Sequence, residues 1–535
     1  MNATRPADRS PRRTFASRGG ARARCRALAL ALALAAGTSV GQAATLTVGT
    51  GGGYATIQSA VDAALAAPGG DEIRVAAGTY RERVVITAPD LGVLTVSGGW
   101  IDGFSRRDPL PASATIVDAE GGGAPLRVDA RGSGDLTVDG FTFTGGRVDS
   151  VLPGGGVALR LEGTSAVTLR GSVVERNEIA SISAPSEGAG IGALLGETSR
   201  LVLRDSRIRD NAARATGTGT AEGGGLFVFA DGNARMEIVG VSLSGNVVSA
   251  TGRQSSAGGV LLEVGGAATA VFTDNRVEAN RAESDRVVAC AGGCLDIFEN
   301  AEAEVRRNRW LDNTSSFSLI ATLSAGAQGT ARLVLSDDIV AGGAGGVDLF
   351  AADTAVLHAA NLTVSDNDAT GITVGRLADG SSPGGRVTLF NSIAFGNGTD
   401  TDIPAFVETG SNLFGVDPRF VDPARHDYRL LPGSPAIDAG NDAPPGGLGP
   451  LDVDGQPRVS GAHVDRGAHE ASTGACRVDR FGELPFVPAS APVCACLRDD
   501  VFRMFRCAFF LPDLLIDMAI PIPLVPGKDV ELEWT

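Results

Sequence analysis

The sequence has very little lysine and few aromatic residues. Among its 46 basic residues only Lys528 is a lysine, and Phe, Trp and Tyr together make up 5% of the 535 residues. Charged residues amount to 20% and the mean hydropathy is +0.10, which excludes both a disordered chain and a membrane protein. The scarcity of aromatic side chains also argues against a large platform for stacking sugars.

A membrane-spanning apolar run is also missing from the N-terminus, where residues 1–43 are predicted to form a secretory signal segment. Eight arginines precede the apolar run 27–36, and Gly41 and Ala43 precede a cut before Ala44. The run is too short to span a membrane. The pair Arg12-Arg13 leaves general secretion and twin-arginine export both open. We therefore expect a secreted or cell-surface protein.

Positive charge is scarce in the mature chain. Removal of the signal segment takes away eight arginines and Asp8, so the net charge falls from −16 to −23. Such an acidic body repels phosphate backbones, and we therefore expect no nucleic-acid partner.

Two residue types recur at a regular interval of 33 to 35 residues. A period of this length is typical of solenoids, in which each unit buries its apolar face against its neighbours. The recurring positions are Asn177, Asn211, Asn246, Asn280 and Asn313, together with Gly190, Gly224, Gly259 and Gly293.

Short alternating runs of apolar and polar residues, such as 167–174 and 201–208, fill each interval and are separated by tight turns. This alternation excludes helical solenoids and predicts an all-β, parallel β-helix over 90–415. The preceding segment 44–89 contains an amphipathic helix at 56–65, which we expect to cap the open first coil.

The runs that end in Val-x-x-Asn177, Ile-x-x-Asn211 or Trp-x-x-Asn313, with Gly-Gly opening the next coil, resemble the repeats of chlamydial polymorphic outer-membrane proteins. They are also similar to the right-handed parallel β-helix of the pectin-lyase-like superfamily. The resemblance implies that each Asn points inward and bonds to adjacent coils. The glycines are expected to allow positive φ at the corners.

The link from each ladder Asn to the next ladder Gly always contains the same number of residues. The four links begin after Asn177, Asn211, Asn246 and Asn280. Equal links are predicted to stack as a wall on one side of the β-helix. Loops on a rigid scaffold often carry function, so this wall is a candidate surface for a glycan or a surface partner; a solvated edge is the alternative.

The C-terminal third has a different composition, rich in Pro, Asp and Gly. Residues 416–471 resemble the segment that closes the β-helix in bacterial choice-of-anchor Q proteins, which implies an irregular cap over the last coil. Residues 472–535 form a cysteine-containing tail. Its apolar stretch 508–526 contains four prolines and two aspartates, so the mature chain is predicted to have no transmembrane segment.

Few residues resemble a catalytic or metal site. The run Gly78-x-Tyr80-x-Glu82 is similar to a pectin methylesterase motif, but the later catalytic residues of that family are missing and a turn is expected. The acidic pair Asp337-Asp338 lacks a hydrolase context and is also expected in a turn. Asp452 and Asp454 could begin a calcium site or form a hydrogen-bonded turn. His426, His463 and His469 are expected to be structural, and no other cofactor is indicated.

Six cysteines remain after export, and disulfides are the expected state. Cys290 and Cys294 are predicted to form a local bond. Cys494 and Cys496 are too close in sequence to pair easily, so each is expected to bond to one of the two outer cysteines, Cys476 and Cys507. Both connectivities remain open, with a zinc site as the alternative.

These features predict an exported, non-enzymatic β-helix protein for adhesion or glycan contact. The alternative is a polysaccharide lyase or hydrolase with unrecognised catalytic residues, since the fold hosts such enzymes. A structural surface spacer is a third hypothesis.

Overall fold

The computed structural model describes residues 43–471 apart from 102, 108–114, 150–152, 183, 317–319 and 378–379. It also describes the backbone of three tail strands: β48 (Cys494–Asp499), β49 (Met504–Leu511) and β50 (Leu514–Pro521). The predicted signal segment, except Ala43, and Cys476 lie outside the described residues.

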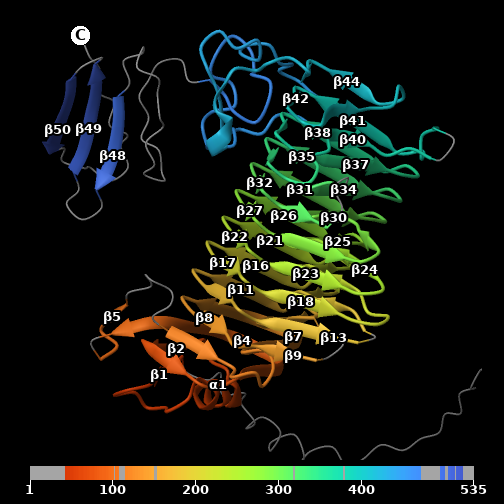
Figure 1. Ribbon diagram of the computed structural model, residues 1–535. Helices are drawn as coiled ribbons and strands as arrows, with labels where there is room; N and C mark the ends of the chain where they lie inside the picture. The colour runs from red at the N-terminus through yellow and green to blue at the C-terminus, as the bar shows by residue number, and fades with distance from the viewer. Residues whose placement is uncertain are drawn as a thin grey trace, which may run out of the picture. The chain divides into compact units, whose positions relative to one another are not determined.

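The described body is a parallel β-solenoid, which confirms the predicted fold class (Figure 1). In a typical coil, strands β15 (Ile191–Leu195) and β16 (Arg200–Arg204) belong to the largest sheet, sheet A. Strand β17 (Arg207–Arg209) belongs to a second sheet, sheet B. Each strand pairs in parallel with its equivalent in the next coil, so the sheets run along the solenoid axis.

Alternating side chains explain why these short runs stack. In strand β20 (Leu226–Ala230), Leu226, Val228 and Ala230 point inward and are buried, while Phe227 and Phe229 lie on the outward face. The same alternation recurs from coil to coil. A continuous apolar core therefore runs inside the solenoid, and no coil can bury its inner face alone.

The asparagines form an inward hydrogen-bonded ladder between the coils. Asn246 accepts bonds at Oδ1 from the backbone N and the Nδ2 of Asn211, at 3.1 and 3.0 Å. Its own Nδ2 donates to Asn280 Oδ1 and to the Ile208 carbonyl, both at 2.9 Å. The side chain thus satisfies backbone groups that the corner leaves unpaired.

The ladder positions require glycine for a different reason from the one expected. Gly190, Gly224, Gly259 and Gly293 do not adopt positive φ. A Cβ at Gly259 would instead lie 2.6 Å from the Gly292 carbonyl oxygen and 2.6 Å from Val277 Cγ1. These positions require glycine because the neighbouring coil approaches the backbone too closely for a side chain.

A second ladder, which no single repeated residue type marks in the sequence, follows another corner. Asn275 Nδ2 donates to Asn308 Oδ1 at 3.1 Å, and Asn308 Nδ2 donates to Asp338 Oδ1 at 3.2 Å. Trp310 Nε1 donates to the other Asp338 oxygen at 3.0 Å. Asp338 is therefore a buried ladder residue, and its pKa is raised to about 7, chiefly by burial.

A short helix caps the first coil, as predicted. Helix α1 (Ile57–Ala66) buries Ile57, Ala60, Val61 and Ala64 and is N-capped by Thr56, whose hydroxyl accepts from the Ser59 backbone N–H. These buried positions lie on one face of the helix, and Leu65 beside them is half-buried.

The esterase-like run at Gly78 forms strand β3 (Gly78–Tyr80) of sheet B, where a turn was expected. The two Glu82 carboxylate oxygens accept from the backbone N–H groups of Ile57 and Gln58, at 2.8 and 3.0 Å. These are free donors at the helix N-terminus, where a carboxylate is stabilising. Tyr80 donates its hydroxyl proton to backbone oxygen, with the Ala76 carbonyl 2.9 Å away.

The segment 416–471 packs along the outward face of sheet B. It contains β46 (Phe420–Asp422), a 3-10 turn (Pro423–Arg425) and β47 (Asp427–Leu430), and in Figure 1 it lies beside β42 (Ile393–Phe395). Its apolar side chains cover Leu311, Ile339 and Ile393. The segment reaches along this flank as far as Arg309 and Asp312, and its predicted place over the last coil stays a prediction. The segment packs here because one outward register position of sheet B changes from arginine to isoleucine. Arg276 and Arg309 occupy this position in two successive coils, and Ile339 occupies it in the next.

Candidate functional site

The equal links after the ladder asparagines stack as predicted and form two small parallel sheets, which we call the wall. Register is kept from link to link; for example, Val248 pairs with Ala282 and Glu187 with Glu222. Small apolar side chains give the wall its own core. Its main strands are β13 (Glu178–Ser181), β18 (Ala212–Ala215), β23 (Val247–Ala250), β28 (Arg281–Ser284), β14 (Ser186–Glu187), β19 (Ala221–Glu222), β24 (Gln254–Ser256) and β29 (Val287–Val288).

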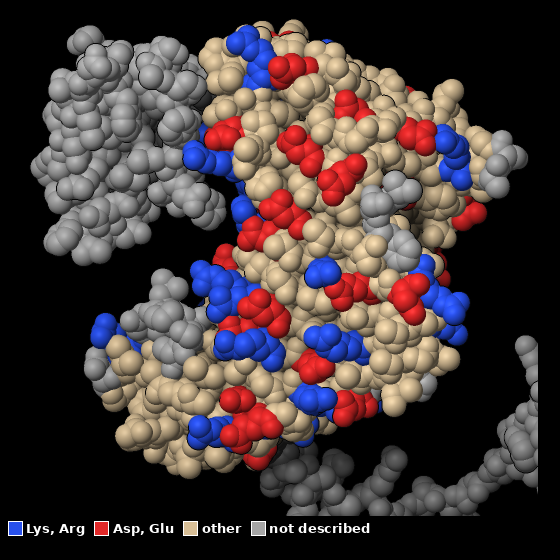
Figure 2. Space-filling model, in the orientation of Figure 1, with Lys and Arg blue, Asp and Glu red and all other residues tan. Residues whose placement is uncertain are grey.

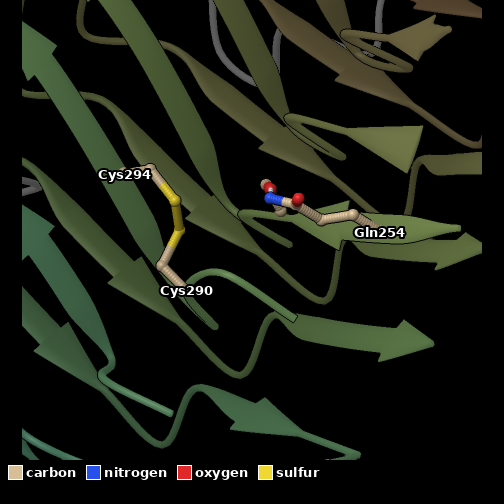
Figure 3. Close-up of a disulfide and its surroundings, with 4 residues drawn as sticks. Gln254, Cys290 and Cys294 are labelled. Atoms are coloured by element: carbon tan, nitrogen blue, oxygen red, sulfur yellow. Dashed lines mark hydrogen bonds between the residues drawn. A yellow bond between two sulfur atoms is a disulfide. The ribbon is translucent and has the colours of Figure 1, made fainter. Parts of the chain in front are cut away.

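A disulfide fixes the wall to sheet A. Cys290, at the end of the fourth link, bonds to Cys294 in strand β30 (Gly293–Ile297), with their Cα atoms 5.9 Å apart. Both cysteines are buried against Phe227 and Leu261. Gln254 lies on the neighbouring wall strand, and its Nε2 donates to Ser256 Oγ at 3.1 Å (Figure 3).

Beside the wall, five residues occupy one register position on the outward face of sheet A. They come from β20, β25 (Val260–Val264), β30, β34 (Leu323–Ala327) and β37 (Val347–Ala351). We call this set the outward row: Phe229, Glu263, Asp296, Gly326 and Phe350. Two half-buried aromatic rings thus flank two acids and a glycine, one residue from each coil. At about 4.8 Å per coil the row extends roughly 19 Å along the axis.

The acids of the row lie close to two acids of the wall. Reduced hydration raises the pKa of Glu263 to about 7, and the charges of Glu222 and Asp296 add to this. The pKa of Glu187 is also raised to about 7, first by burial and then by Glu222 and Glu263. The pKa of Asp296 is raised by the protein around it, although its side chain is exposed. Glu263 and its wall neighbour Glu187 are therefore poorly hydrated acids, whereas Asp296 is open to solvent.

Elsewhere on the visible surface, basic and acidic side chains are interspersed (Figure 2). Glu237, for example, contacts both Arg200 and Arg204. Surface ion pairs of this kind contribute little stability, but they balance the local charge.

The structure places Asp452 and Asp454 in a hydrogen-bonded turn. Asp452 Oδ1 accepts from the backbone N–H groups of Asp454 and Gln456, and its Oδ2 accepts from that of Glu470. Asp454 pairs with Arg309 of sheet B at 2.5 Å. Among the described residues, no three His, Cys, Asp or Glu side chains are grouped so that they could hold a metal ion.

Each histidine of the C-terminal segment pairs with an aspartate. His426 contacts Asp312 at 2.9 Å, and His463 contacts Asp442 at 2.8 Å. The third pair is His469 with Asp454 at 3.1 Å. The first pair joins the segment to the solenoid, because Asp312 directly follows strand β32 (Arg309–Leu311) of sheet B.

The other acid of the Asp337-Asp338 pair faces the C-terminal segment. Asp337 is buried and lies 3.6 Å from the buried Arg458 side chain of the C-terminal segment. In the tail, the antiparallel register places Cys496 opposite Cys507 and Cys494 opposite Phe509. The disulfide connectivity of the tail stays a prediction, with both alternatives open.

Comparisons with known proteins give little beyond the fold. No protein-family model and no curated protein matches the chain. Among solved structures, the crystal structure of pectate lyase Pel9A is similar, with a TM-score of 0.36 and 13% identity. The alignment covers 81% of this chain and 98% of that one. Within the described part of the chain, there is no apolar helix of membrane-spanning length.

Proposed function

We propose that this chain is an exported β-helix protein that contacts a glycan along the outward row, and that it acts in adhesion or surface binding rather than catalysis. The observation that carries the proposal is the alignment of Phe229, Glu263, Asp296 and Phe350 in one register along the axis. An extended polysaccharide has the shape that such a linear site requires.

The chemistry of the row suits a neutral sugar chain. Phenylalanine rings can pack against the apolar faces of sugar rings, and carboxylates accept hydrogen bonds from sugar hydroxyls. Gly326 has no side chain and leaves room between Asp296 and Phe350; Asp296 Oδ1 lies 3.4 Å from the position that a Cβ would occupy there. Uronate-containing chains are disfavoured because Glu187, Glu222 and Glu263 together create a negative potential.

Binding of neutral and acidic glycans to the mature protein tests the proposal. Phe229→Ala and Glu263→Gln are expected to weaken binding of a neutral glycan about tenfold or more, through loss of ring contact and of an acceptor. Glu304→Gln is the matched control, because Glu304 is an exposed acid on another strand of sheet A, β31 (Glu302–Arg306). Unchanged binding in both row variants would contradict the proposal.

Hydrolysis is a second candidate function, favoured by the Glu263 and Asp296 pair. The two residues are paired in register on neighbouring coils and their charges interact, so two carboxyl groups lie side by side, as a glycosidase requires. A pKa of about 7 for Glu263 suits a general acid at neutral pH. Release of new reducing ends by the mature protein, lost in Glu263→Gln, would replace the binding proposal by this one. Release of unsaturated ends would instead indicate lyase chemistry.

A further inference from the structure

Three charged side chains are buried together where the C-terminal segment meets the solenoid. Asp337 directly follows β35 (Arg332–Ser336) of sheet A, at a corner with positive φ, and Arg458 and Glu470 belong to the segment. The side chains of Asp337 and Glu470 are each 1% exposed, and that of Arg458 is 2% exposed. Charges removed from water in this way are costly unless they are paired. The cluster therefore holds two buried carboxyl groups around one guanidinium.

The guanidinium of Arg458 is occupied by carbonyl groups and leaves both carboxyl groups beyond hydrogen-bond distance. Its two Nη atoms donate to the backbone carbonyls of Ala468, Asp465 and Gly467, at 3.0, 2.9 and 2.7 Å. Asp337 Oδ1 lies 3.6 Å from Arg458 Nε, and Glu470 Oε2 lies 3.7 Å from Nη2. Among the described residues, neither Asp337 Oδ1 nor Arg458 Nε has a hydrogen-bond partner. Arg458 therefore attracts both carboxylates but can balance the charge of only one.

The charges around the two carboxyl groups are unequal. Two further arginines of the solenoid, Arg306 and Arg307, act on Asp337 in addition to the central guanidinium. Glu470 has the central guanidinium on one side and the buried Asp465, a second negative charge, on the other. The other titratable groups of this interface each have a partner of their own: Asp338, Asp452, Asp454 and His469. Glu470 is therefore the less compensated carboxyl group of the cluster.

Charge balance favours a proton on Glu470. With Asp337 and Glu470 both ionised, the three buried side chains would carry a net negative charge away from water, and one proton removes it. Burial raises the pKa of Glu470 to about 7 from the ordinary 4.5 of a glutamate, and the charge of Asp465 raises it further against the opposing effect of Arg458. The docked segment therefore holds this proton more tightly than a segment exposed to water.

We propose that Glu470 is a proton-binding site that controls the docking of segment 416–471 on the solenoid. With the proton bound, the cluster is neutral and the segment packs over sheet B. Without the proton, two buried carboxylates share one guanidinium, and the segment detaches more easily. Detachment uncovers the apolar side chains of Leu311, Ile339 and Ile393. This proposal does not depend on glycan binding at the outward row.

Hydrogen exchange of the mature protein as a function of pH tests the proposal, with β47 as the reporter of docking and β20 as the reference in the solenoid. Because the folded-state pKa of Glu470 is raised, its contribution to docking is fully present below about pH 4.5 and is lost as the pH rises to about 7. After correction for intrinsic exchange rates, we expect the protection of β47 relative to β20 to fall about tenfold or more over this range.

Two substitutions in the cluster sharpen the test. Glu470→Gln has no titratable group at this position and should remove the fall. Asp337→Asn leaves Arg458 free to balance an ionised Glu470, so the fall should become smaller. The matched control is Asp442→Asn, which removes an exposed aspartate from an Asp–His pair of the same segment and should behave like the wild type. His426→Gln changes another titratable contact between segment and solenoid and should also leave the fall in place.

A fall of wild-type size in Glu470→Gln would overturn the proposal. Equal pH profiles of β47 and β20 in the wild-type chain would overturn it as well, and this comparison needs no substitution and no assumption that a variant folds. Loss of the fall in His426→Gln or Asp442→Asn, with the fall kept in Glu470→Gln, would assign the proton to a histidine pair instead.

Discussion

At the scale of single residues, the Asn ladder carries more stability than its surface area suggests. Replacing Asn246 by Ala removes the acceptor of two buried N–H donors from Asn211 and leaves the Ile208 carbonyl without its side-chain donor. Each unsatisfied buried group costs about 1–3 kcal/mol, so we expect Asn246→Ala to destabilise the fold by about 3 kcal/mol or more. Denaturant unfolding measures this. Asn233→Ala, at an exposed turn, is the control and should have almost no effect.

The ladder glycine at position 259 is limited by space. A Cβ there meets backbone and a buried valine at 2.6 Å, so Gly259→Ala should destabilise by about 1–3 kcal/mol. Gly196→Ala is the control, because its Cβ would meet nothing closer than 3.8 Å. Similar unfolding midpoints for the two variants would show that the coils can separate locally.

Asp338 makes stability depend on pH. Its folded-state pKa, about 7, lies above the ordinary value of 3.8 for an aspartate, so the folded chain holds this proton more tightly than the unfolded chain. The contribution of Asp338 to the free energy of unfolding is therefore greatest below about pH 4, and it is lost as the pH rises to about 7. The unfolding free energy of Asp338→Asn should fall less than that of the wild type between these pH values. Parallel pH profiles would contradict the assignment.

At the scale of elements, the Cys290–Cys294 bond joins the end of the fourth wall link to strand β30 of sheet A. The bond closes a loop of only a few residues, so removing it should cost about 2 kcal/mol. We expect this loss of stability to be confined to the wall, because the solenoid core does not contain these cysteines. In a Cys290→Ala, Cys294→Ala double variant, hydrogen exchange should accelerate in β29 and leave β26 (Thr269–Thr273) unchanged. Equal acceleration in both strands would show that the bond supports the whole coil.

At the scale of the whole molecule, residues 1–43 are predicted to direct export. The full-length chain should leave the cytoplasm and begin at Ala44, which N-terminal sequencing of the exported protein would show. A chain that starts at Ala44 should remain inside, because it lacks the arginine-rich and apolar regions that the export machinery reads. An unprocessed N-terminus on exported protein would contradict the predicted cut.

Much of the fold could be predicted because its signal is local and repeated. The period fixed the coil length, and the alternation fixed which side chains face the core. The equal links predicted the stacked wall. The second ladder was missed because its members change from Asn275 and Asn308 to Asp338, so no single residue type repeats along it.

The candidate sites could not be predicted in the same way, because their members are far apart in sequence. Phe229, Glu263, Asp296 and Phe350 belong to four different coils, and only the register of the strands aligns them. His426 was expected to be structural, and only the folding of 416–471 onto sheet B brings it to Asp312.

The sequence by itself determined the repeating architecture, since each coil contains its own strands, corners and ladder residue. Only the tertiary structure decided where chemistry can occur. Stacking aligns residues one coil period apart, and the C-terminal segment packs where sheet B turns apolar at Ile339 and Ile393. These contacts join residues that no local pattern connects, and both proposed sites are made from them.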